Sequence, residues 1–324
     1  LLHVMLLVAF GIKAAVFPLS FWLPDSYPTA PAPVTAVFAG LLTKVGVYAM
    51  VRTETLLFPG DTLNTPLMVA ALLTMVVGIL GALAQSDIKR LLSFTLVSHI
   101  GYMVFGLAMS SAAGLAAAVF YVAHHITIQT SLFLVTGLIE RRGGSSSVDR
   151  LGGLAKLSPL LALLFFIPAM NLAGIPPFSG FLGKVGLMQA GVELGTPLAY
   201  ALVIGGVLTS LLTLLAIARV WNRAFWRRPA DAEHPDPVLL AGPAARVSGP
   251  GAKLNSTVTL LPRTMVGSTM GLVAVGVALT VFAGPLFELS GHAARDMLDR
   301  TPYIHSVLGD GSPVPATPVT GGGR

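Results

Sequence analysis

The stretch NLAGIPPFSGFLGKVGL (residues 171–187) combines a helix break and a charged side chain inside an apolar segment. Pro176 and Pro177 cannot donate backbone hydrogen bonds to the preceding turn, and three neighbouring glycines loosen the chain further, so a helix must break here. Lys184 follows within two helical turns. Because a charge is costly among apolar neighbours, we expect a broken helix with a functional lysine beside it.

The first 22 residues, LLHVMLLVAFGIKAAVFPLSFW, repeat this arrangement. Lys13 lies in the middle of the segment, and Pro18 removes the hydrogen bond that the Ala14 carbonyl would accept, so we expect a second break or kink. Two proline-interrupted apolar segments, each with a lysine nearby, are typical of transporters that are built from inverted repeats. We therefore treat Lys13 and Lys184 as candidate ion or proton sites.

Both breaks lie in a chain that has the composition of a multi-pass membrane protein. Only 10% of its 324 residues are charged and the mean hydropathy is +0.80, whereas soluble proteins carry about 25% charged residues. We predict an all-α membrane helix bundle of about eight transmembrane helices, two of them broken, with antiparallel neighbours. The apolar segments are 1–22, 31–51, 65–84, 91–109, 112–139, 157–192 (interrupted), 197–221 and 263–284.

The distribution of basic residues predicts how this bundle is oriented. Of the 20 lysines and arginines, 13 fall on the loops after the first, third, fifth and seventh segments, and four fall on the opposite side or in the tail. The positive-inside rule makes the first set of loops cytoplasmic and places the C-terminal tail outside the cell membrane. The basic residues are scattered without an interleaved aromatic stripe, so we expect no nucleic-acid partner.

Several chemistries are excluded for this chain. It has no cysteine, which excludes disulfides, thiolate metal sites, iron–sulfur clusters and thiol catalysis. The sequence also contains no P-loop, no dinucleotide fingerprint and no HExxH motif, and no Ser–His–acid set can be placed on a plausible scaffold. We therefore expect a chain that is not an enzyme and that holds no cofactor, no metal and no nucleotide.

Lys44 is the third lysine inside an apolar segment. It lies seven residues from Val51, about 10 Å along a helix. A lysine at that depth can snorkel part of the way to the surface, or it can be a buried functional group. The functional interpretation is favoured, because an ionised group at mid-membrane costs about 2.5–3.5 kcal/mol.

Histidines lie between the lysine-bearing segments. Tyr121, His125 and Gln129 are spaced to share one helix face. Imidazole titrates near neutral pH, so His99, His124 and His125 could relay protons between the lysines. Hydrogen bonding between helices is the alternative role. Both roles stay open for His125, and the hydrogen-bonding role is favoured for His99 and His124.

Acidic residues are missing from the apolar segments, because the 14 Asp and Glu lie in loops, at segment ends or in the tail. A lysine relay needs a counter-charge that switches it. Asp25 in WLPDSY could supply that charge if the loop folds back. Otherwise we expect the partner in a missing N-terminal part of the protein or in another subunit.

Four motifs now indicate a family. The chain resembles the antiporter-like membrane subunits that respiratory complex I shares with Mrp-type multisubunit Na⁺/H⁺ antiporters, and the resemblance runs to about residue 308. Within that superfamily it is most similar to the D subunits of Mrp antiporters, on the strength of the double histidine HHI and the ending AGPLFELSGHAARDMLDRTPYIHSVLG. The motifs are WLPDSYPTAPAPVTAVFAGLLTKVGVYA (22–49), SDIKRLLSFTLVSHIGYM (86–103), HHITIQTSLFL (124–134) and GIPPFSGFLGKVGL (174–187).

The resemblance implies a fourteen-helix subunit with two inverted five-helix repeats, of which this chain is an N-terminally truncated fragment carrying helices 7 to 14. Lys13 and Lys184 would be the broken-helix lysines of the two repeats, and Lys44 the connecting lysine. A glutamate that pairs with Lys13 would lie upstream of this chain. Gln129 stands where relatives carry a lysine, and His99 where they carry glutamine, which puts both relay roles in doubt.

The resemblance also implies a division of the chain. Residues 222–262 are expected to form a flexible cytoplasmic loop, because their core is rich in Pro, Gly and Ala, and the Gly/Pro/Thr-rich end of the tail is expected to be mobile. The regions are the end of the first repeat (1–51), the second repeat (65–221), the loop (222–262), the last transmembrane helix (263–284) and the C-terminal tail (285–324).

These observations predict a membrane protein that belongs to a monovalent cation (Na⁺)/proton antiporter. Its partners would be protons, monovalent cations, lipid and other subunits of the complex. Protons would pass through Lys13, Lys44, Lys184 and the His125 face, and charging one lysine would disfavour the charged form of the next. One alternative is a proton-pumping, antiporter-like subunit of complex I or a related hydrogenase. Another is a scaffold subunit with a degenerate channel, in which leucine would replace the lysines without loss.

Overall fold

The computed structural model describes residues 1–236, 239 and 261–309. Over these residues the chain is helical and contains no strand, which confirms the predicted all-α bundle. Most of the expected flexible loop, from residue 240 to 260, and the tail from residue 310 lie outside the described residues.

Six helices in the described part of the chain are long and apolar enough to cross a membrane. The two other predicted spans are the broken ones, whose halves are each too short to be counted. The six are Ala32–Leu57 (α3, η2, α4 and η3), α5 (Asn64–Leu83), α6 (Ile88–Ala108), α7 (Ala112–Gly143), Pro197–Trp226 (α11, Pro197–Val220, and η4, Trp221–Trp226) and α13 (Arg263–Val281).

Both breaks occur where the prolines predict them. Helix α1 (Leu2–Ala14) ends one residue before Ala15, whose φ of 63° is left-handed, and Pro18 lies in the following turn. Helix α9 (Pro159–Ala173) ends at Gly174, with φ 81°, and the chain passes the two prolines before α10 begins (Ser179–Leu194). Short helices α2 (Trp22–Ser26) and η1 (Tyr27–Thr29) follow the first break.

The helix that carries Lys44 is longer and less regular than its hydropathy predicts. It begins as α3 (Ala32–Val37), passes through the π-helical turn η2 (Phe38–Leu42), continues as α4 (Thr43–Arg52) and ends in a second π-helical turn, η3 (Thr53–Leu57). The predicted end at residue 51 is therefore six residues short. The missed turn contains the acidic residue Glu54, which is buried.

Residues 283–308, most of which were expected as tail, form two further helices, α14 (Ala283–Leu298) and α15 (Thr301–Leu308). Helix α14 buries Ala283, Ser290 and Ala294. Small residues allow helices to approach closely but raise the mean hydropathy only slightly. The hydropathy of the sequence therefore did not predict α14, whose buried residues have small side chains.

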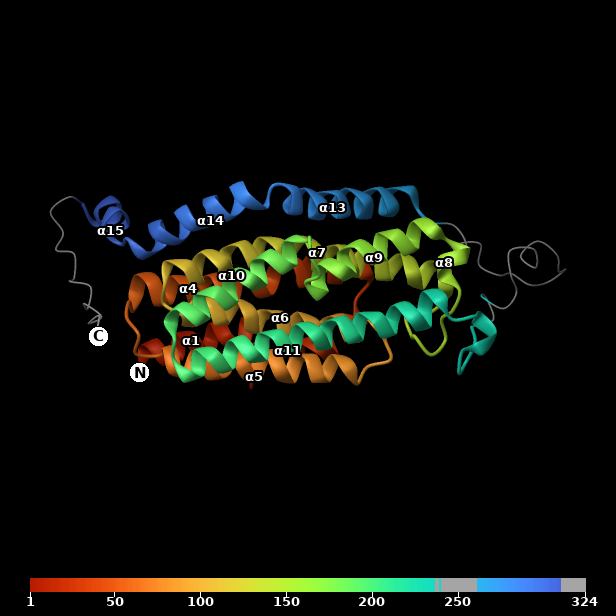
Figure 1. The fold of residues 1–324 in the computed structure, drawn as a ribbon, viewed down its shortest axis with the longest axis horizontal. Coiled ribbons are helices and arrows are strands. Elements are labelled where there is room, and N and C mark those ends of the chain that lie inside the picture. The colour runs from red at the N-terminus through yellow and green to blue at the C-terminus, as the bar shows by residue number, and fades with distance from the viewer. Residues whose placement is uncertain (237–238, 240–260, 310–324) are drawn as a thin grey trace.

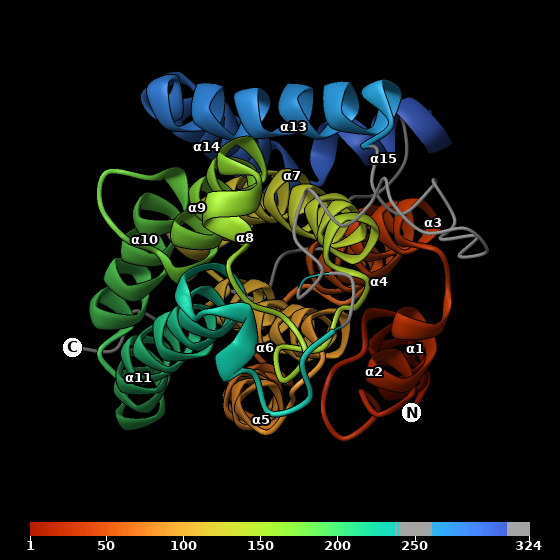
Figure 2. The same ribbon diagram turned by 90° about the vertical axis from the view of Figure 1, so that its right-hand side faces the viewer.

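The bundle is built around α6, which is buried along nearly its whole length. Helix α7 lies beside α6 and contacts α9, α10, α13 and α14. Helices α13 and α14 follow each other end to end and form an outer layer over α7, as Figures 1 and 2 show. The start of α1 and helix α15 lie at one end of the bundle, and the end of α7 and α8 (Leu154–Leu157) lie at the other (Figure 1).

Candidate functional site

Lys184 lies directly against the break between α9 and α10. Its side chain is buried, and Nζ donates to the carbonyl oxygens of Leu172 at 3.2 Å and Ala173 at 3.1 Å. These carbonyls belong to the last turn of α9, which has no further helical donors and carries the negative end of the helix dipole. The break therefore provides the ammonium with backbone oxygens at a depth where no carboxylate among the described residues contacts it.

Aromatic and histidine side chains continue from Lys184 into the bundle. The Lys184 Nζ lies 5.1 Å from the centre of the Tyr102 ring, which adds a cation–π contact. The Tyr102 ring centre is 5.6 Å from that of His99, and the His99 and His125 ring centres are 5.1 Å apart. His99 Nδ1 and the Tyr121 hydroxyl share a hydrogen bond of 2.7 Å. All five side chains are buried.

His124 and His125 are neighbours in sequence but face different helices. His124 Nδ1 is 3.0 Å from the Ser179 Oγ, at the first residue of α10. Ser179 Oγ also contacts Asn171 Oδ1 at 3.3 Å, and the Gly180 amide donates to the same Asn171 oxygen at 2.9 Å. His124 is therefore part of the hydrogen bonding across the break, whereas His125 faces α6.

Several buried ring nitrogens have no hydrogen-bond partner among the described residues. They are His99 Nε2, His124 Nε2 and both nitrogens of His125. Gln129 donates through Nε2 to the Leu92 carbonyl at 2.8 Å, while its Oε1 has no partner in the described chain. Tyr121, His125 and Gln129 therefore share one face of α7, as their spacing predicts. Some of the polar atoms on this face have no hydrogen-bond partner among the described residues.

Lys44 is also buried and also bonded to a backbone oxygen. Its Nζ donates to the Ala39 carbonyl at 2.6 Å, inside the π-helical turn η2. A π-turn shifts the helical hydrogen-bond pattern and leaves carbonyls available to side chains. Lys44 lines a cavity together with Ala118 and Val122 of α7, the helix that carries His124 and His125.

Lys13 is placed differently from the other two lysines. It lies in the last turn of α1, directly before the predicted break, but its side chain is exposed at the edge of the described bundle. The structure brings Lys184 and the three histidines together, places Lys44 beside α7, which carries two of them, and does not bring Lys13 to them. A role for Lys13 in the relay remains a prediction.

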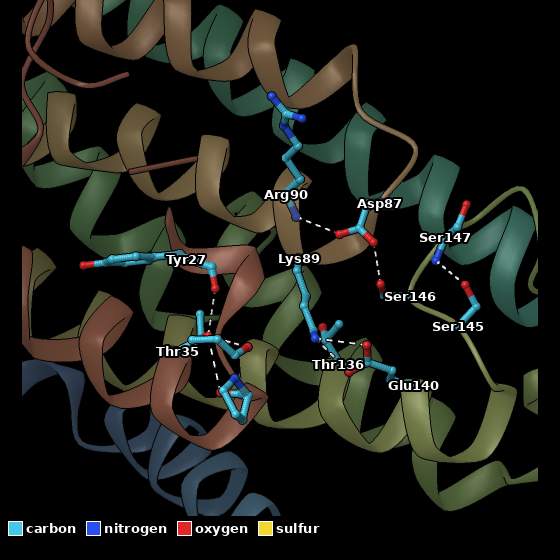
Figure 3. Close-up of polar contacts among 12 residues, drawn as sticks. Tyr27, Thr35, Asp87, Lys89, Arg90, Thr136, Glu140, Ser145, Ser146 and Ser147 are labelled. Carbon is cyan, nitrogen blue, oxygen red and sulfur yellow. Dashed lines mark hydrogen bonds and ion pairs between the residues drawn. The ribbon is translucent and has the colours of Figure 1, made fainter. Parts of the chain in front are cut away.

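Asp25 does not fold back to a buried lysine. Its Oδ1 accepts a hydrogen bond from Arg90 Nη2 at 2.9 Å, and both side chains are largely exposed. The possibility that Asp25 supplies the counter-charge is therefore wrong. The loop is held instead by local contacts, such as the Thr35 hydroxyl that donates to the Tyr27 carbonyl (Figure 3).

The sequence did not predict two partly buried acid–base pairs, because it placed their members in loops or gave them no role. Lys89 of α6 is buried and lies 2.8 Å from a carboxylate oxygen of Glu140 on α7, as Figure 3 shows. His3 Nε2 lies 2.5 Å from Glu54 Oε1 at the other end of the bundle, and both side chains are at least 85% buried. Each pair joins residues that are 51 positions apart, so local spacing gave no signal.

The chain matches the family model described as "NADH:quinone oxidoreductase/Mrp antiporter, TM" over residues 1–213. It belongs to this family. It is 41% identical to the D subunit of the Na⁺/H⁺ antiporter of Alkalihalophilus pseudofirmus over 94% of this chain and 57% of the relative. It is 39% identical to the D subunit of the Na⁺/H⁺ antiporter of Bacillus subtilis over 72% of this chain and 47% of the relative.

Solved structures agree with this assignment. The Mrp complex from Dietzia sp. contains a chain that is 35% identical, with a TM-score of 0.81, covering 95% of this chain and 61% of that one. A chain of respiratory complex I from Thermus thermophilus is 25% identical, with a TM-score of 0.71, covering 91% of this chain and 58% of that one. The chain spans about half the length of the curated relatives it matches, and it is a multi-pass membrane protein of an antiporter subunit family.

Proposed function

We propose that this chain is a membrane subunit of a multisubunit monovalent cation (Na⁺)/proton antiporter and that its buried lysines and histidines conduct protons along the middle of the membrane. The observation that carries the proposal is the buried row of groups from Lys184 through Tyr102 and His99 to His125, with Lys44 buried beside a cavity that α7, the helix of His125, also lines. Relatives that cover most of this chain are named as Na⁺/H⁺ antiporter subunits.

The chemistry of these groups suits proton exchange. Each buried ammonium is held by carbonyl oxygens rather than by a carboxylate, so no fixed negative charge locks its proton in place. Among the described residues, one ring nitrogen of His99 and both of His125 have no hydrogen-bond partner, so these imidazoles can donate or accept in either tautomer. Because like charges repel, the lysines would hold protons alternately, with bridging water between groups that are not in direct contact.

Lys13 completes the proposal from the edge of the described bundle. The resemblance implies that a glutamate on a helix absent from this chain pairs with it, and its exposed position leaves its side chain accessible to such a partner. Other subunits of the complex would cover part of the apolar surface of the bundle. The end that carries the basic loops would face the cytoplasm.

The alternative is a proton-pumping subunit of complex I or a related hydrogenase. The fold is shared with complex I, as the family description and the Thermus structure show. The alternative has weaker support, because the Mrp chain of known structure is more similar in both sequence and fold. Neighbouring genes for small antiporter subunits, rather than for quinone reductase subunits, would decide between the two.

Alanine substitutions in the full-length complex test the relay. Lys13→Ala, Lys44→Ala and Lys184→Ala should each reduce Na⁺/H⁺ exchange by about 100-fold or more, since positioned acid–base groups typically contribute about 10²–10⁴. Exchange is measured in membrane vesicles, and subunit assembly is checked by co-purification. Lys156→Ala, at an exposed lysine of the short helix α8, is the matched control and should retain exchange. Unchanged exchange in Lys13→Ala and Lys184→Ala membranes would contradict the proposal.

A further inference from the structure

Two cavities follow one another along the seam between the Lys44 helix, α7 and α14. The inner cavity, of about 270 Å³, is lined by Lys44, Ala118 of α7 and Ala293 of α14. The outer cavity, of about 160 Å³, is lined by Glu54 and by Leu115 of α7. Each is large enough to hold water, which needs about 10–15 Å³. The same three helices therefore line both cavities.

The order of the lining residues shows that the two cavities lie one after the other along the seam. The Lys44 helix lines the inner cavity as far as Val51 and the outer one at Glu54, one turn later. Helix α14 lines the inner cavity at Met297 and the outer one at Leu298. Both helices run toward the end of the bundle that carries α15 and the start of α1 (Figure 1), so the outer cavity lies at that end.

The two cavities differ in polarity. Besides Glu54, the outer one is lined by Asp61, Ser110 and Ser111. The inner one is lined mainly by aliphatic side chains and alanines, with Lys44 as its charged residue. Going along the seam from the end of the bundle, polar lining residues thus come first and the charged Lys44 last. Water that enters and leaves an apolar stretch of such a path can gate it.

Glu54, which lines the outer cavity, forms a pair with His3; we call this outer cavity the mouth of the route. Glu54 Oε1 lies 2.5 Å from His3 Nε2, and the His3 ring stacks on Phe58 at 4.4 Å between ring centres. The other charged groups nearby are Asp61, in the same cavity, and Arg52, whose guanidinium lies over the Tyr303 ring of α15. The pair thus lies between the end of the bundle and the inner cavity that contains Lys44.

We infer that this seam is a proton access route to Lys44 from the end of the bundle opposite the basic loops, with Glu54 and His3 as the groups that exchange protons at its mouth. A proton taken up by the Glu54 carboxylate would pass through water in the two cavities to the neutral Lys44 amine, and return by the same path. Lys44 lies ten residues from Glu54, about 15 Å along the helix. The inference rests on the proposed proton relay for its purpose but not for its geometry.

Cysteine labelling tests the geometry without measuring transport. This chain has no cysteine, so a single introduced thiol is the only one that can react in this chain. Ala118→Cys places a thiol in the inner cavity, while the adjacent Ala117→Cys places one at the same depth, on the side of α7 that faces Gly186 of α10. The full complex in sealed vesicles is treated with a charged, membrane-impermeant methanethiosulfonate reagent from each side.

We expect Ala118→Cys to be labelled from the side of the α15 end and Ala117→Cys to remain unlabelled from both sides. Val122→Cys, which lines the same cavity, serves if Ala118→Cys does not assemble. Equal labelling of the two alanine positions, labelling of Ala118→Cys from the other side only, or its failure to react would each overturn the route. These outcomes do not depend on whether the complex exchanges Na⁺ for protons.

A second arm tests the pair at the mouth. Glu54→Gln should reduce exchange by about 10-fold or more while Ala118→Cys in the same background still reacts. Glu288→Gln, at an exposed carboxylate on α14, should leave exchange unchanged. Full exchange in the Glu54→Gln variant would show that Glu54 and His3 do not exchange protons on the transport path. Loss of exchange in the lysine variants but not in Glu54→Gln would support the relay and overturn this entrance.

Discussion

At the scale of single residues, the two buried lysines share one kind of partner. Lys184 donates to the carbonyls that end α9, and Lys44 donates to a carbonyl within a π-helical turn. In both cases an irregular helix frees the oxygen that receives the ammonium. A carbonyl dipole stabilises the charge without adding a full opposite charge. Under the proposed relay, this would leave both protonation states accessible, as proton transfer requires.

The Lys89–Glu140 pair has a carboxylate partner, which indicates a structural role. Glu140→Gln should destabilise the protein by about 1–3 kcal/mol, because it leaves the buried Lys89 ammonium without its counter-charge. The effect is limited by the 41% exposure of the Glu140 side chain. Thermal unfolding of the purified complex in detergent measures it. Replacing both members, by Lys89→Met with Glu140→Leu, should recover part of the loss.

Asp25→Asn is the matched control for that experiment. It removes a carboxylate from an ion pair with Arg90 in which both side chains are largely exposed, and such pairs contribute about 0–1 kcal/mol. A loss of stability as large as that of Glu140→Gln would show that burial does not distinguish the two pairs.

The sequence predicted part of the residue-scale site. The break motif placed Lys184 beside freed carbonyls, because proline acts on its own helix. The contact of His3 with Glu54 could not be predicted, because it joins residues 51 positions apart that only the tertiary packing brings together. The π-turn that bonds Lys44 was also unpredictable, since residues 38–42 contain no proline to announce it.

At the scale of elements, the turn between α9 and α10 is shaped to hold the lysine. Gly174 ends α9 with φ 81°, and a Cβ there would lie 3.0 Å from Lys184 Cδ and 3.1 Å from Nζ. Glycine is therefore needed for its backbone conformation and for the space it leaves. The backbone of the break and the position of the ammonium are coupled.

Gly174→Ala should lower the stability of the complex by about 1–2 kcal/mol because of the left-handed conformation, and should also reduce exchange by displacing the Lys184 ammonium. Gly195→Ala is the control, because Gly195 ends α10 with φ 68° but a Cβ there meets nothing closer than 3.9 Å. Thermal unfolding and vesicle exchange should show similar destabilisation in both variants and a transport defect in Gly174→Ala alone. Equal exchange in the two variants would show that Gly174 does not position the Lys184 ammonium for transport.

Hydropathy predicted the existence of the helices better than their ends. It located the breaks and the long spans, since these depend on prolines and on runs of apolar residues. It missed η3 and α14, because their buried faces contain a carboxylate in one case and small residues in the other. Helices that bury polar or small side chains against protein do not need the hydropathy that contact with lipid requires.

At the scale of the whole molecule, the two ends of the bundle differ in charge. The end near α8 and the close of α7 carries most of the loop arginines and lysines, while the other carries α15 and the start of α1 (Figure 1). Because each described spanning helix runs from one end to the other, the side of any one loop fixes the sides of all the rest. One measurement of which side of the membrane a loop lies on therefore determines the orientation of the whole bundle.

Two exposed positions at opposite ends can answer it. Ser306→Cys lies on α15, and Ala230→Cys lies on η5 (Pro229–Asp231) beyond the basic end of α11. In right-side-out vesicles an impermeant thiol reagent should label Ser306→Cys and leave Ala230→Cys unlabelled, because basic loops are retained in the cytoplasm. The reverse pattern would invert the orientation and move the mouth of the Glu54 route to the cytoplasm. Labelling of both from one side would contradict the separation of the two ends.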